Sequence, residues 1–394
     1  MATPTAPTIY DVARTAGVSI ASVSRVLNGR RNPSPDICER VQRAAAELGY
    51  VPDNAARALS VKLKEVVGVV MRRPLSAGGP PVPAPWLPAG AGAAWDTDGL
   101  LGYDVFADET ESLQFHDMVN RGVERAAQRR GFDLLLRSVD ITDHDAGRRV
   151  LGVARKSDGL ILHDRVLEPW QIDEISQQIP ILTLAGLPSA APTTANVGSD
   201  NAMGTRALAR HLLYDHGYRT IGYLSGYGDS PDSNTRLEIL AAEVRAAGAV
   251  LFSGPQWQGN YYAAGAAVVT ERLLASDTPL PRAIVCANDQ TALGVMFALR
   301  RSGVDVPRQV AVTGFDDIPM ARHVHPQLTT VRQSIAQLGE TAFEVLYSMI
   351  SREEPAERDI QLPTRLTCRE SCGCQPGVEL AGVTDLSTVR HLRS

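Results

Sequence analysis

A small residue, a hydroxyl, a guanidinium and an amide recur along one side of a short segment near the N-terminus. They are Ala21, Ser24, Arg25 and Asn28. The spacing i, i+3, i+4 and i+7 places them on one face of a helix, opposite the apolar Val23, Val26 and Leu27. A guanidinium can donate two hydrogen bonds to a guanine edge, and hydroxyl and amide groups suit phosphate oxygens. This face therefore predicts a helix that enters a nucleic-acid groove.

Two short helices joined by a tight turn would position that face. Thr8 suits the N-cap of the first helix, Gly17 a left-handed stop, and Ser19 the N-cap of the second. Ser34-Pro35-Asp36 starts a third amphipathic helix that Gly49 ends. An ordinary helical hairpin with a solvated polar face is the alternative. Three helices within about fifty residues favour a complete helix-turn-helix unit.

Five short motifs occur in a fixed order in this region. They are Tyr10-Asp-Val-Ala, Ala16-Gly-Val-Ser19, Val23-Ser-Arg-Val-Leu-Asn28, Leu48-Gly-Tyr-Val-Pro52 and Ala55-Ala-Arg-Ala-Leu59. In order, spacing and distance from the N-terminus they resemble the lactose-repressor (LacI/GalR) family. The resemblance implies a hinge helix after the head, with Leu59 as a wedge in the minor groove of a near-palindromic operator. Such a hinge needs a partner helix, which implies a homodimer. Packing against that partner helix is the alternative role of Leu59.

The resemblance also implies roles for individual residues of the head. Arg25 reads bases, and Ile20 and Ala21 occupy two variable specificity positions, where apolar groups can meet a thymine methyl. The remaining hydroxyl and amide side chains hold phosphates and fix the register: Thr8, Ser19, Ser24, Asn28 and Ser34. Several of these also serve as helix caps.

The charge of the chain is unevenly distributed. The whole chain of 394 residues carries a net charge of -5, but residues 1–65 hold nine Lys and Arg against six Asp and Glu, and residues 12–35 contain no acid. A basic head on an acidic body favours phosphate contact at one end. The length predicts two or three domains. Without a signal peptide or a long apolar run, a cytoplasmic protein is expected.

Five cysteines are scattered along the chain: Cys38, Cys286, Cys368, Cys372 and Cys374. An odd number argues against a disulfide framework. The last three are close enough in sequence to hold a metal ion, but no histidine or fourth cysteine follows at a familiar spacing. The sequence therefore favours free thiols, with no metal and no cofactor.

After residue 65, short apolar runs alternate with helical segments. The runs span 66–70, 132–136, 159–162, 181–184, 220–224, 283–286 and 310–313, and helices are expected near 113–130, 144–155 and 168–178. Crossover and terminal strands are expected at 328–333, 362–366 and 369–371. The pattern predicts parallel sheets in two similar lobes, with a ligand between the carboxyl ends of their strands. It resembles the periplasmic-binding-protein-like body of the same family, which implies three chain crossovers near 197–200, 331–335 and 360–363.

The predicted architecture is α/β. It comprises a helix-turn-helix head (1–53), a hinge helix and linker (54–64), a two-lobe effector-binding and dimerisation body (65–375) and a C-terminal tail (376–394). A segment rich in proline and glycine at 72–112 replaces a short family connection. Its composition favours mobile chain over a lid. The family's aromatic-rich entry to the first helix of the body is changed here to Ser112-Leu-Gln-Phe-His116, so effector specificity does not carry over there.

Three polar residues stand at predicted strand ends or early in helices of the body: Arg236, Asn288 and Asp316. They match the family's sugar-hydroxyl ligands, and a donor fork facing an acceptor suits a polyol. His163 and Ile335 align with further positions of the effector-binding cleft. Tyr261, or alternatively Trp257, is the aromatic residue that would cover a sugar. Helix capping is the alternative for each Asn or Asp, above all for Asp317.

A DNA-reading head on a ligand-binding body predicts a transcriptional repressor whose operator affinity a carbohydrate-like effector switches. A purine-like corepressor is the alternative ligand. A secreted solute-binding protein would need a signal peptide and has no use for the head. An enzyme is not expected, since Gly226-Tyr-Gly228 lacks the third glycine of a dinucleotide fingerprint and no common hydrolase motif occurs. No leucine heptad follows residue 375, which favours a dimer over a coiled-coil tetramer.

Overall fold

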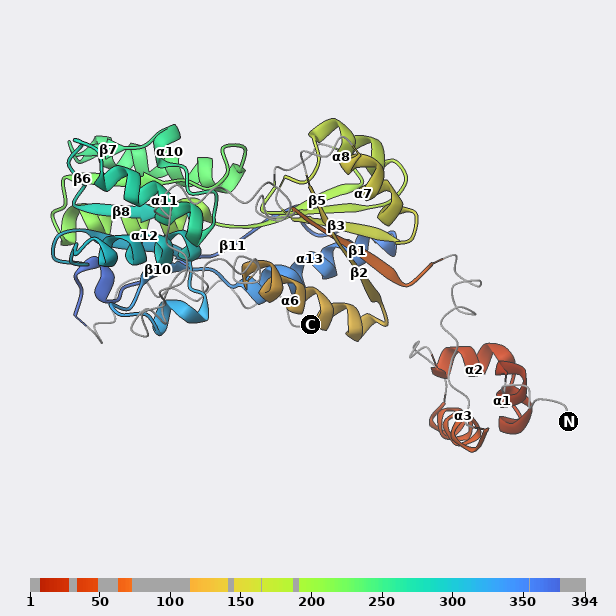
Figure 1. Ribbon diagram of the computed structural model, residues 1–394. Coiled ribbons are helices and arrows are strands. Elements are labelled where there is room, and N and C mark those ends of the chain that lie inside the picture. Colours follow the sequence, from red (N-terminus) through yellow and green to blue (C-terminus); the bar gives the residue numbers. More distant parts are fainter. Residues whose placement is uncertain are drawn as a thin grey trace, which may run out of the picture. The chain divides into compact units, whose positions relative to one another are not determined.

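The computed structural model describes residues 8–27, 34–48, 63–72, 114–140, 145–163, 165–186, 191–353 and 355–375. The chain divides into two compact units, Met1–Glu65 and Val66–Ser394. The first unit holds three helices in its described part, and the second holds two mainly parallel sheets with helices on both faces (Figure 1).

The three helices of the first unit are α1 (Ile9–Ala16), α2 (Ile20–Leu27) and α3 (Pro35–Leu48). Their apolar faces meet in a small core, as the predicted helical spacing requires. The buried members of this core are Val12, Ala13, Ala16, Val23, Val41 and Ala44. The predicted three-helix head is confirmed.

Local hydrogen bonds define both ends of α1. The backbone N–H and the hydroxyl of Thr8 both donate to the Asp11 carboxylate, at 2.9 and 2.7 Å. Gly17 ends the helix in the left-handed conformation, with φ 62°. From α3, Arg40 donates to the carbonyl oxygens of Ala16 and Gly17, at 2.6 and 2.9 Å. The turn between the two helices is thereby fastened to the third.

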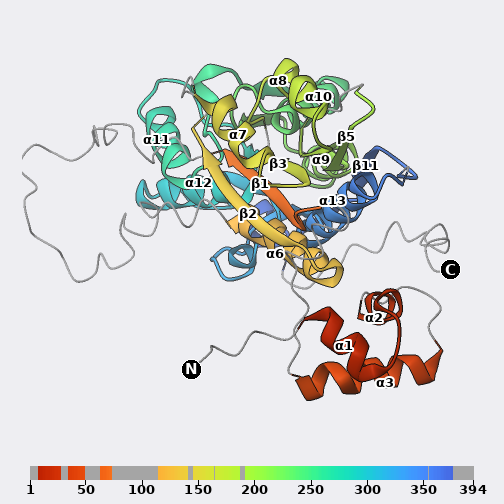
Figure 2. The same cartoon turned by 90° about the vertical axis from the view of Figure 1, so that its right-hand side faces the viewer.

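The first lobe of the second unit is a six-stranded sheet in the order β11-β5-β4-β3-β1-β2. Its strands are β1 (Val66–Arg72), β2 (Asp133–Val139), β3 (Gly159–His163), β4 (Ile181–Leu184), β5 (Thr194–Ser199) and β11 (Asp359–Leu362). All of them pair in parallel. The helices α6 (Gln114–Arg130) and α13 (Ile335–Ile350) cover one face, and α7 (Ala146–Ala154) and α8 (Pro169–Ser176) cover the other (Figure 2).

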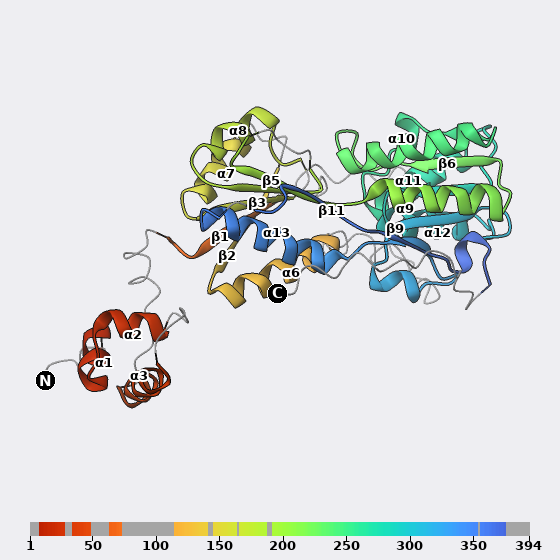
Figure 3. The same cartoon turned by 180° about the vertical axis from the view of Figure 1, so that it is seen from behind.

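The second lobe has a matching sheet in the order β12-β10-β9-β8-β6-β7. Its strands are β6 (Thr220–Leu224), β7 (Val250–Phe252), β8 (Ala283–Cys286), β9 (Ala311–Asp316), β10 (Thr329–Arg332) and β12 (Arg365–Thr367). Of these, β12 pairs antiparallel with β10, and the others pair in parallel. The helices α9 (Asn201–Arg210) and α10 (Pro231–Ala246) lie on one face, and α11 (Ala263–Leu274) and α12 (Asp289–Arg301) on the other (Figure 3).

The chain passes between the lobes three times. The first passage, from β5 to α9, falls at residue 200, and the second, from β10 to α13, at 333–334. Both lie where the sequence predicted them. The third, from β11 to β12, is at 363–364, so the predicted range 360–363 overlaps it and ends one residue short. Residues 369–371 were expected in a terminal strand, and this is wrong. Glu370–Cys372 forms the 3-10 turn η6.

The sequence pattern overlooked three short strands. β5 (TANVGS) and β11 (DIQL) mix polar with apolar residues, and β7 (VLF) is an apolar run of only three residues. Most of the predicted expansion at 72–112, and the whole tail 376–394, lie outside the described residues. Within the described part of the chain, no helix is long and apolar enough to cross a membrane.

Replacing Gly17 with alanine should destabilise the head. A Cβ there would lie 2.9 Å from Arg40 Nη2 and would occupy a left-handed backbone position, which costs about 1 kcal/mol or more for a non-glycine residue. Hydrogen exchange of the head amides in the full chain measures this. Gly152→Ala is the matched control, because no atom lies within 4 Å of its Cβ position. Unchanged head protection in Gly17→Ala would contradict the role of the turn.

Candidate functional site

The exposed residues of the head surround the start of α2. Ser19 precedes this helix, and its hydroxyl accepts a hydrogen bond from the Ser22 N–H at 3.2 Å. Ile20, the first residue of α2, is 43% exposed. Thr8 and Ser34 stand exposed just before α1 and α3. Capping and phosphate contact are compatible uses of these hydroxyls, because a hydroxyl can donate and accept at once.

The remaining predicted DNA contacts are only partly covered. Ala21, Ser24 and Arg25 lie in α2, but their side chains are not among the described ones, and Asn28 and Leu59 fall outside the described residues. Their contacts stay predictions. The helical period places positions 21, 24 and 25 away from Val23, which is fully buried in the head core.

In the second unit, the buried guanidinium of Arg236 joins four elements. Arg236, on α10, is 4% exposed. Its Nε donates to Asn201 Oδ1 at 2.7 Å, its Nη1 to the carbonyl oxygen of Ala287 at 2.5 Å, and its Nη2 to Asp232 Oδ2 at 3.3 Å. Its Cζ lies 3.5 Å from the centre of the Phe315 ring. These partners hold a cation in one orientation at the strand ends of the lobe.

Asp316 ends the neighbouring strand β9 and is also 4% exposed. Burial raises the pKa of its carboxyl to about 7, against the opposing charge of Arg236, a hydrogen bond from Gln333 and the weaker influence of His116. Because His116 belongs to α6 of the first lobe, groups of both lobes act on this carboxyl. The site therefore holds an acid that titrates near neutral pH.

Asn288 and Tyr261 adjoin this pair. Asn288 caps α12 through Thr291, and its Nδ2 donates to the carbonyl oxygen of Tyr261 at 3.3 Å. The Tyr261 hydroxyl lies 2.7 Å from Ser230 Oγ, and burial raises the pKa of this phenol. Trp257, the alternative aromatic residue, is 3% exposed inside the hydrophobic core of the lobe. The ring in contact with Arg236 is that of Phe315, so Tyr261 as the ring that would cover a ligand stays a prediction.

On the first lobe, His163 ends β3 and is 1% exposed. Its ring centre lies 5.2 Å from that of His116 on α6. Ile335 is the first residue of α13 and packs in the hydrophobic core of this lobe. Four of the six predicted effector residues, Arg236, Tyr261, Asn288 and Asp316, thus lie in the second lobe. His163 lies in the first lobe beside His116, whose charge influences Asp316, and Ile335 belongs to the core of the first lobe.

Sequence reasoning missed an ion pair that spans the two lobes. Arg72 ends β1 of the first lobe, and its Nη1 lies 3.0 Å from Asp229 Oδ1 of the second. Its Cζ also lies 3.7 Å from the centre of the Tyr227 ring. The position of Arg72 at the carboxyl end of the apolar run 66–70 was the available signal, since parallel strand ends form ligand sites.

Asp317 has a different role from Asp316. Burial would raise the pKa of its carboxyl, but hydrogen bonds from Arg369 and Arg332 outweigh burial and lower it. Both guanidinium groups lie 2.5 Å from its oxygens. The helix-cap reading of Asp317 is therefore replaced by an ion-pair role that joins the C-terminal segment to β10.

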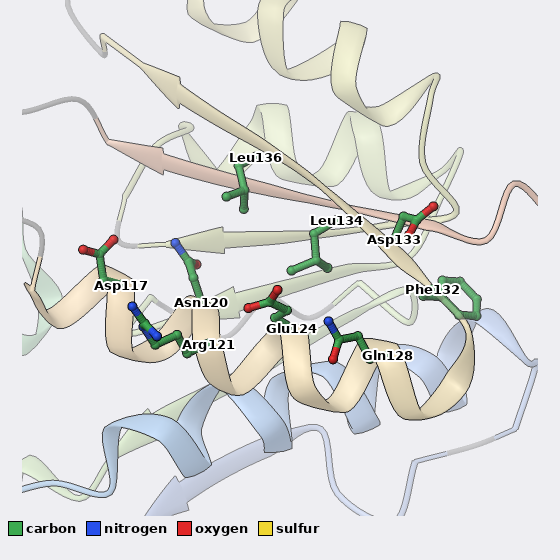
Figure 4. A pocket seen from close by; sticks show the side chains of 9 residues that line it. All are labelled: Asp117, Asn120, Arg121, Glu124, Gln128, Phe132, Asp133, Leu134 and Leu136. Carbon is green, nitrogen blue, oxygen red and sulfur yellow. The ribbon is translucent and has the colours of Figure 1, made fainter.

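A surface groove lies on the first lobe, between α6 and the edge strand β2 (Figure 4). Polar side chains of α6, among them Asn120 and Glu124, face Leu134 and Leu136 of the strand. None of the predicted effector residues lines this groove. It is a feature separate from the strand-end site.

The C-terminal cysteines also differ from the sequence expectation. The sequence shows no histidine at a familiar spacing from them, but the fold brings two histidines to them. His211 and His216 approach Cys372 and Cys374, with one ligand atom of each residue within 4.8 Å of the others. No spacing rule could find these histidines, because more than 150 residues separate them from the cysteines.

Two family descriptions match the chain. Residues 8–53 match "Bacterial regulatory proteins, lacI family" and residues 209–372 match "Periplasmic binding protein-like domain". The regulator GalS of Salmonella typhimurium is 30% identical, over 86% of this chain and 88% of its own. The ribose operon repressor of Escherichia coli is 29% identical, over 92% of this chain and 99% of its own.

Solved structures agree with these matches. A complex of the transcriptional regulator CelR with cellobiose is 27% identical, covers 93% of this chain and 99% of its own, and has a TM-score of 0.60. The Lac repressor dimer bound to operator is 24% identical, covers 93% of this chain and 99% of its own, and has a TM-score of 0.67. The latter likeness supports the fold.

Asp316→Asn should change how stability depends on pH. The folded pKa of about 7 lies above the ordinary value of 3.8, so Asp316 contributes stability below about pH 4 that is lost as pH rises through about 7. The free energy of unfolding of the parent minus that of the variant should therefore decrease as the pH rises from about 4 to about 7. Denaturant titrations at several pH values measure it. Asp277→Asn, in an exposed loop, is the control. A pH-independent difference for Asp316→Asn would contradict the assignment.

Proposed function

This chain belongs to the lacI family of bacterial regulatory proteins, and we propose that it is a repressor whose operator affinity a small polyhydroxylated ligand changes. A DNA-binding regulator with a separate effector-binding body is the family's common design. No catalytic step is part of the proposal, and its place of action is the cytoplasm, where operator DNA lies.

The geometry of the head is the observation that carries the DNA-binding part. The apolar side of α2 is buried in the core of the head, and Ser19 and Ile20 are exposed at the N-terminal end of α2. A recognition helix meets base edges through its N-terminal residues. We assign Arg25 to base reading, and Thr8, Ser19, Ser24, Asn28 and Ser34 to phosphates.

A homodimer is part of this proposal. Leu59 as a minor-groove wedge requires two hinge helices side by side, and a two-fold axis implies a near-palindromic operator. The edge strand β2 supports a contact between copies, because its outer edge is unpaired in the sheet and Leu136 on it is 51% exposed. An exposed apolar residue on a sheet edge is suited to burial against a second chain.

The effector is proposed to bind at the strand ends around Arg236 and Asp316. A cationic donor fork close to a carboxylate and an amide suits the vicinal hydroxyls of a sugar. His163, Tyr261 and Asn288 surround the pair, with Ile335 at the edge of the set. Relatives named as a ribose operon repressor and a CelR–cellobiose complex favour a sugar. Relatives named PurR keep a purine-like corepressor as the second candidate.

A hydrogen-bonded path connects this site to the passages between the lobes. Gln333, in the second passage, donates to Asp316 and accepts from the hydroxyl of Ser199 at 2.5 Å, just before the first passage. A ligand that takes over the hydrogen bond to Asp316 would alter the same side chain that holds the two passages together. A ligand shifts the equilibrium only through such a difference in affinity between two states.

Arg25→Ala should abolish most operator specificity while leaving non-specific DNA binding largely intact. One bidentate contact to guanine contributes about 1–3 kcal/mol of discrimination. Affinities for operator and random DNA at several salt concentrations measure the ratio. Arg14→Ala is the control, since Arg14 is an exposed arginine of α1 that pairs with Asp11. An unchanged ratio in Arg25→Ala would remove Arg25 from base reading.

Arg236→Lys should weaken effector binding by at least tenfold while leaving operator binding of the free protein intact. Lysine keeps the charge but not the fork that contacts Asn201, Ala287 and Asp232. Calorimetry with ribose, cellobiose and purine bases, followed by operator binding with the tightest of them, tests both parts. Arg245→Ala, exposed on the same helix, is the control. Parent-like affinity in Arg236→Lys would place the ligand elsewhere.

A further inference from the structure

Four side chains of the second lobe gather where its C-terminal segment meets the end of α9. They are His211, His216, Cys372 and Cys374. One ligand atom from each lies within 4.8 Å of the other three. His211 and Cys372 are buried, at 4% and 0% exposure, and the other two are half-buried. Two imidazoles and two thiols that lie this close together are the donors that zinc prefers.

Two departures from regular backbone create this arrangement. After α9, residues His211–Asp215 form the π-helical turn η3, and the His216 N–H donates to the carbonyl oxygen of His211 at 3.1 Å. An α-helix would turn residues five apart by about 140°, whereas a π-turn aligns them. Gly373, with φ 103°, reverses the chain between Cys372 and Cys374. Both pairs of side chains can therefore converge.

Four of the six distances between the ligand atoms match those of a tetrahedral metal site, and all six are within 4.8 Å. With zinc–nitrogen bonds of about 2.0 Å and zinc–sulfur bonds of about 2.3 Å, neighbouring ligand atoms stand about 3.3 Å apart for two nitrogens and about 3.5 Å for nitrogen and sulfur. The Nε2 atoms of the histidines are 3.1 Å apart. Cys374 Sγ lies 3.4 Å from His211 Nε2 and 3.5 Å from His216 Nε2, and Cys372 Sγ lies 3.5 Å from His211 Nε2.

Surrounding groups orient these donors as they do in known metal sites. The other ring nitrogen of His211, Nδ1, lies 2.8 Å from a carboxylate oxygen of Asp215. A carboxylate there fixes the tautomer that presents Nε2 to a metal. The Thr329 hydroxyl donates to Cys372 Sγ at 3.0 Å, and the ring of His216 stacks on Tyr218. Hydrogen bonding alone cannot account for the cluster. His211 Nε2 can make a hydrogen bond in only one direction, yet His216, Cys372 and Cys374 all lie within hydrogen-bonding distance of it.

We propose that His211, His216, Cys372 and Cys374 form a structural zinc site. The four protein donors fill the tetrahedral shell, so the site leaves no open position for catalysis. Hard cations such as Mg²⁺ and Ca²⁺ are excluded by the lack of oxygen ligands. Cys368 lies 3.5 Å from His211 Nε2 but is not among the four mutually close donors.

The zinc ion would fasten the last segment of the body to α9. That segment follows β12, the strand entered by the third passage between the lobes, and Arg369 within it pairs with Asp317. The other end of α9 begins with Asn201, which holds Arg236. A metal ion that binds the folded chain but not the unfolded chain would stabilise the lobe by mass action.

The test measures zinc directly. Full-length protein purified with a reducing agent and without chelators should contain one zinc per chain by elemental analysis. Cys374→Ser and His216→Ala should each lose most of it. Cys368→Ser and Cys38→Ser, which remove thiols outside the proposed four, should keep it. A strong chelator should lower the melting temperature of the parent by several degrees and leave the two ligand variants unchanged.

A second measurement does not depend on the variants folding. Chelator-treated parent protein titrated with Co²⁺ should develop the intense visible bands of a tetrahedral site together with thiolate-to-metal charge transfer, saturating at one equivalent. Absence of these bands, with no zinc bound after loading, would overturn the proposal. So would a mass 2 Da lower with loss of two titratable thiols in zinc-free protein, which would identify a disulfide pair instead. Loss of zinc in Cys368→Ser would contradict the four assigned ligands.

Discussion

The buried guanidinium of Arg236 is the interaction on which the second lobe's site depends. A cation at 4% exposure must be paired, because desolvation without partners costs several kcal/mol. Its partners come from the starts of α9 and α10, the end of β8 and the ring of Phe315. One side chain thus contacts four segments of the lobe: the starts of α9 and α10, the end of β8 and the strand β9. Asp316 then faces a preoriented positive charge rather than a mobile one.

The same requirement extends from the site to the passages between the lobes. Asp316 accepts from Gln333, and Gln333 accepts from Ser199, so an acid buried in the second lobe is linked through Gln333 to two of the three passages. Arg72 and Asp229 add a contact across the lobes. Charged and polar groups that are costly to bury alone are grouped where the lobes meet. Binding of a ligand at Asp316 would therefore act on the contacts that join the two lobes.

Much of this could be predicted from the sequence because it rests on local rules. Helix caps, apolar periodicity and the proline at the start of α3 act over a few residues, and the three head helices and most strands follow from them. The strand ends that carry Asp316 and His163 could be predicted for the same reason. Each of these polar residues closes a segment that begins with a run of apolar residues. The strands β5 and β11 lack such a run, and the run of β7 is only three residues long, so all three were overlooked.

Long-range convergence was decided only by the tertiary structure. Sequence order determined that Cys372 and Cys374 are close, and that His211 and His216 are five residues apart, but not that the two pairs meet. The meeting depends on the π-turn after α9, the left-handed Gly373 and the third passage of the chain, and no one of these alone brings the two pairs together. Likewise, Arg72 is simply the last residue of β1 until the second lobe brings Asp229 to it. Local energies select helices and strands, whereas the packing of whole sheets sets which distant side chains share a site.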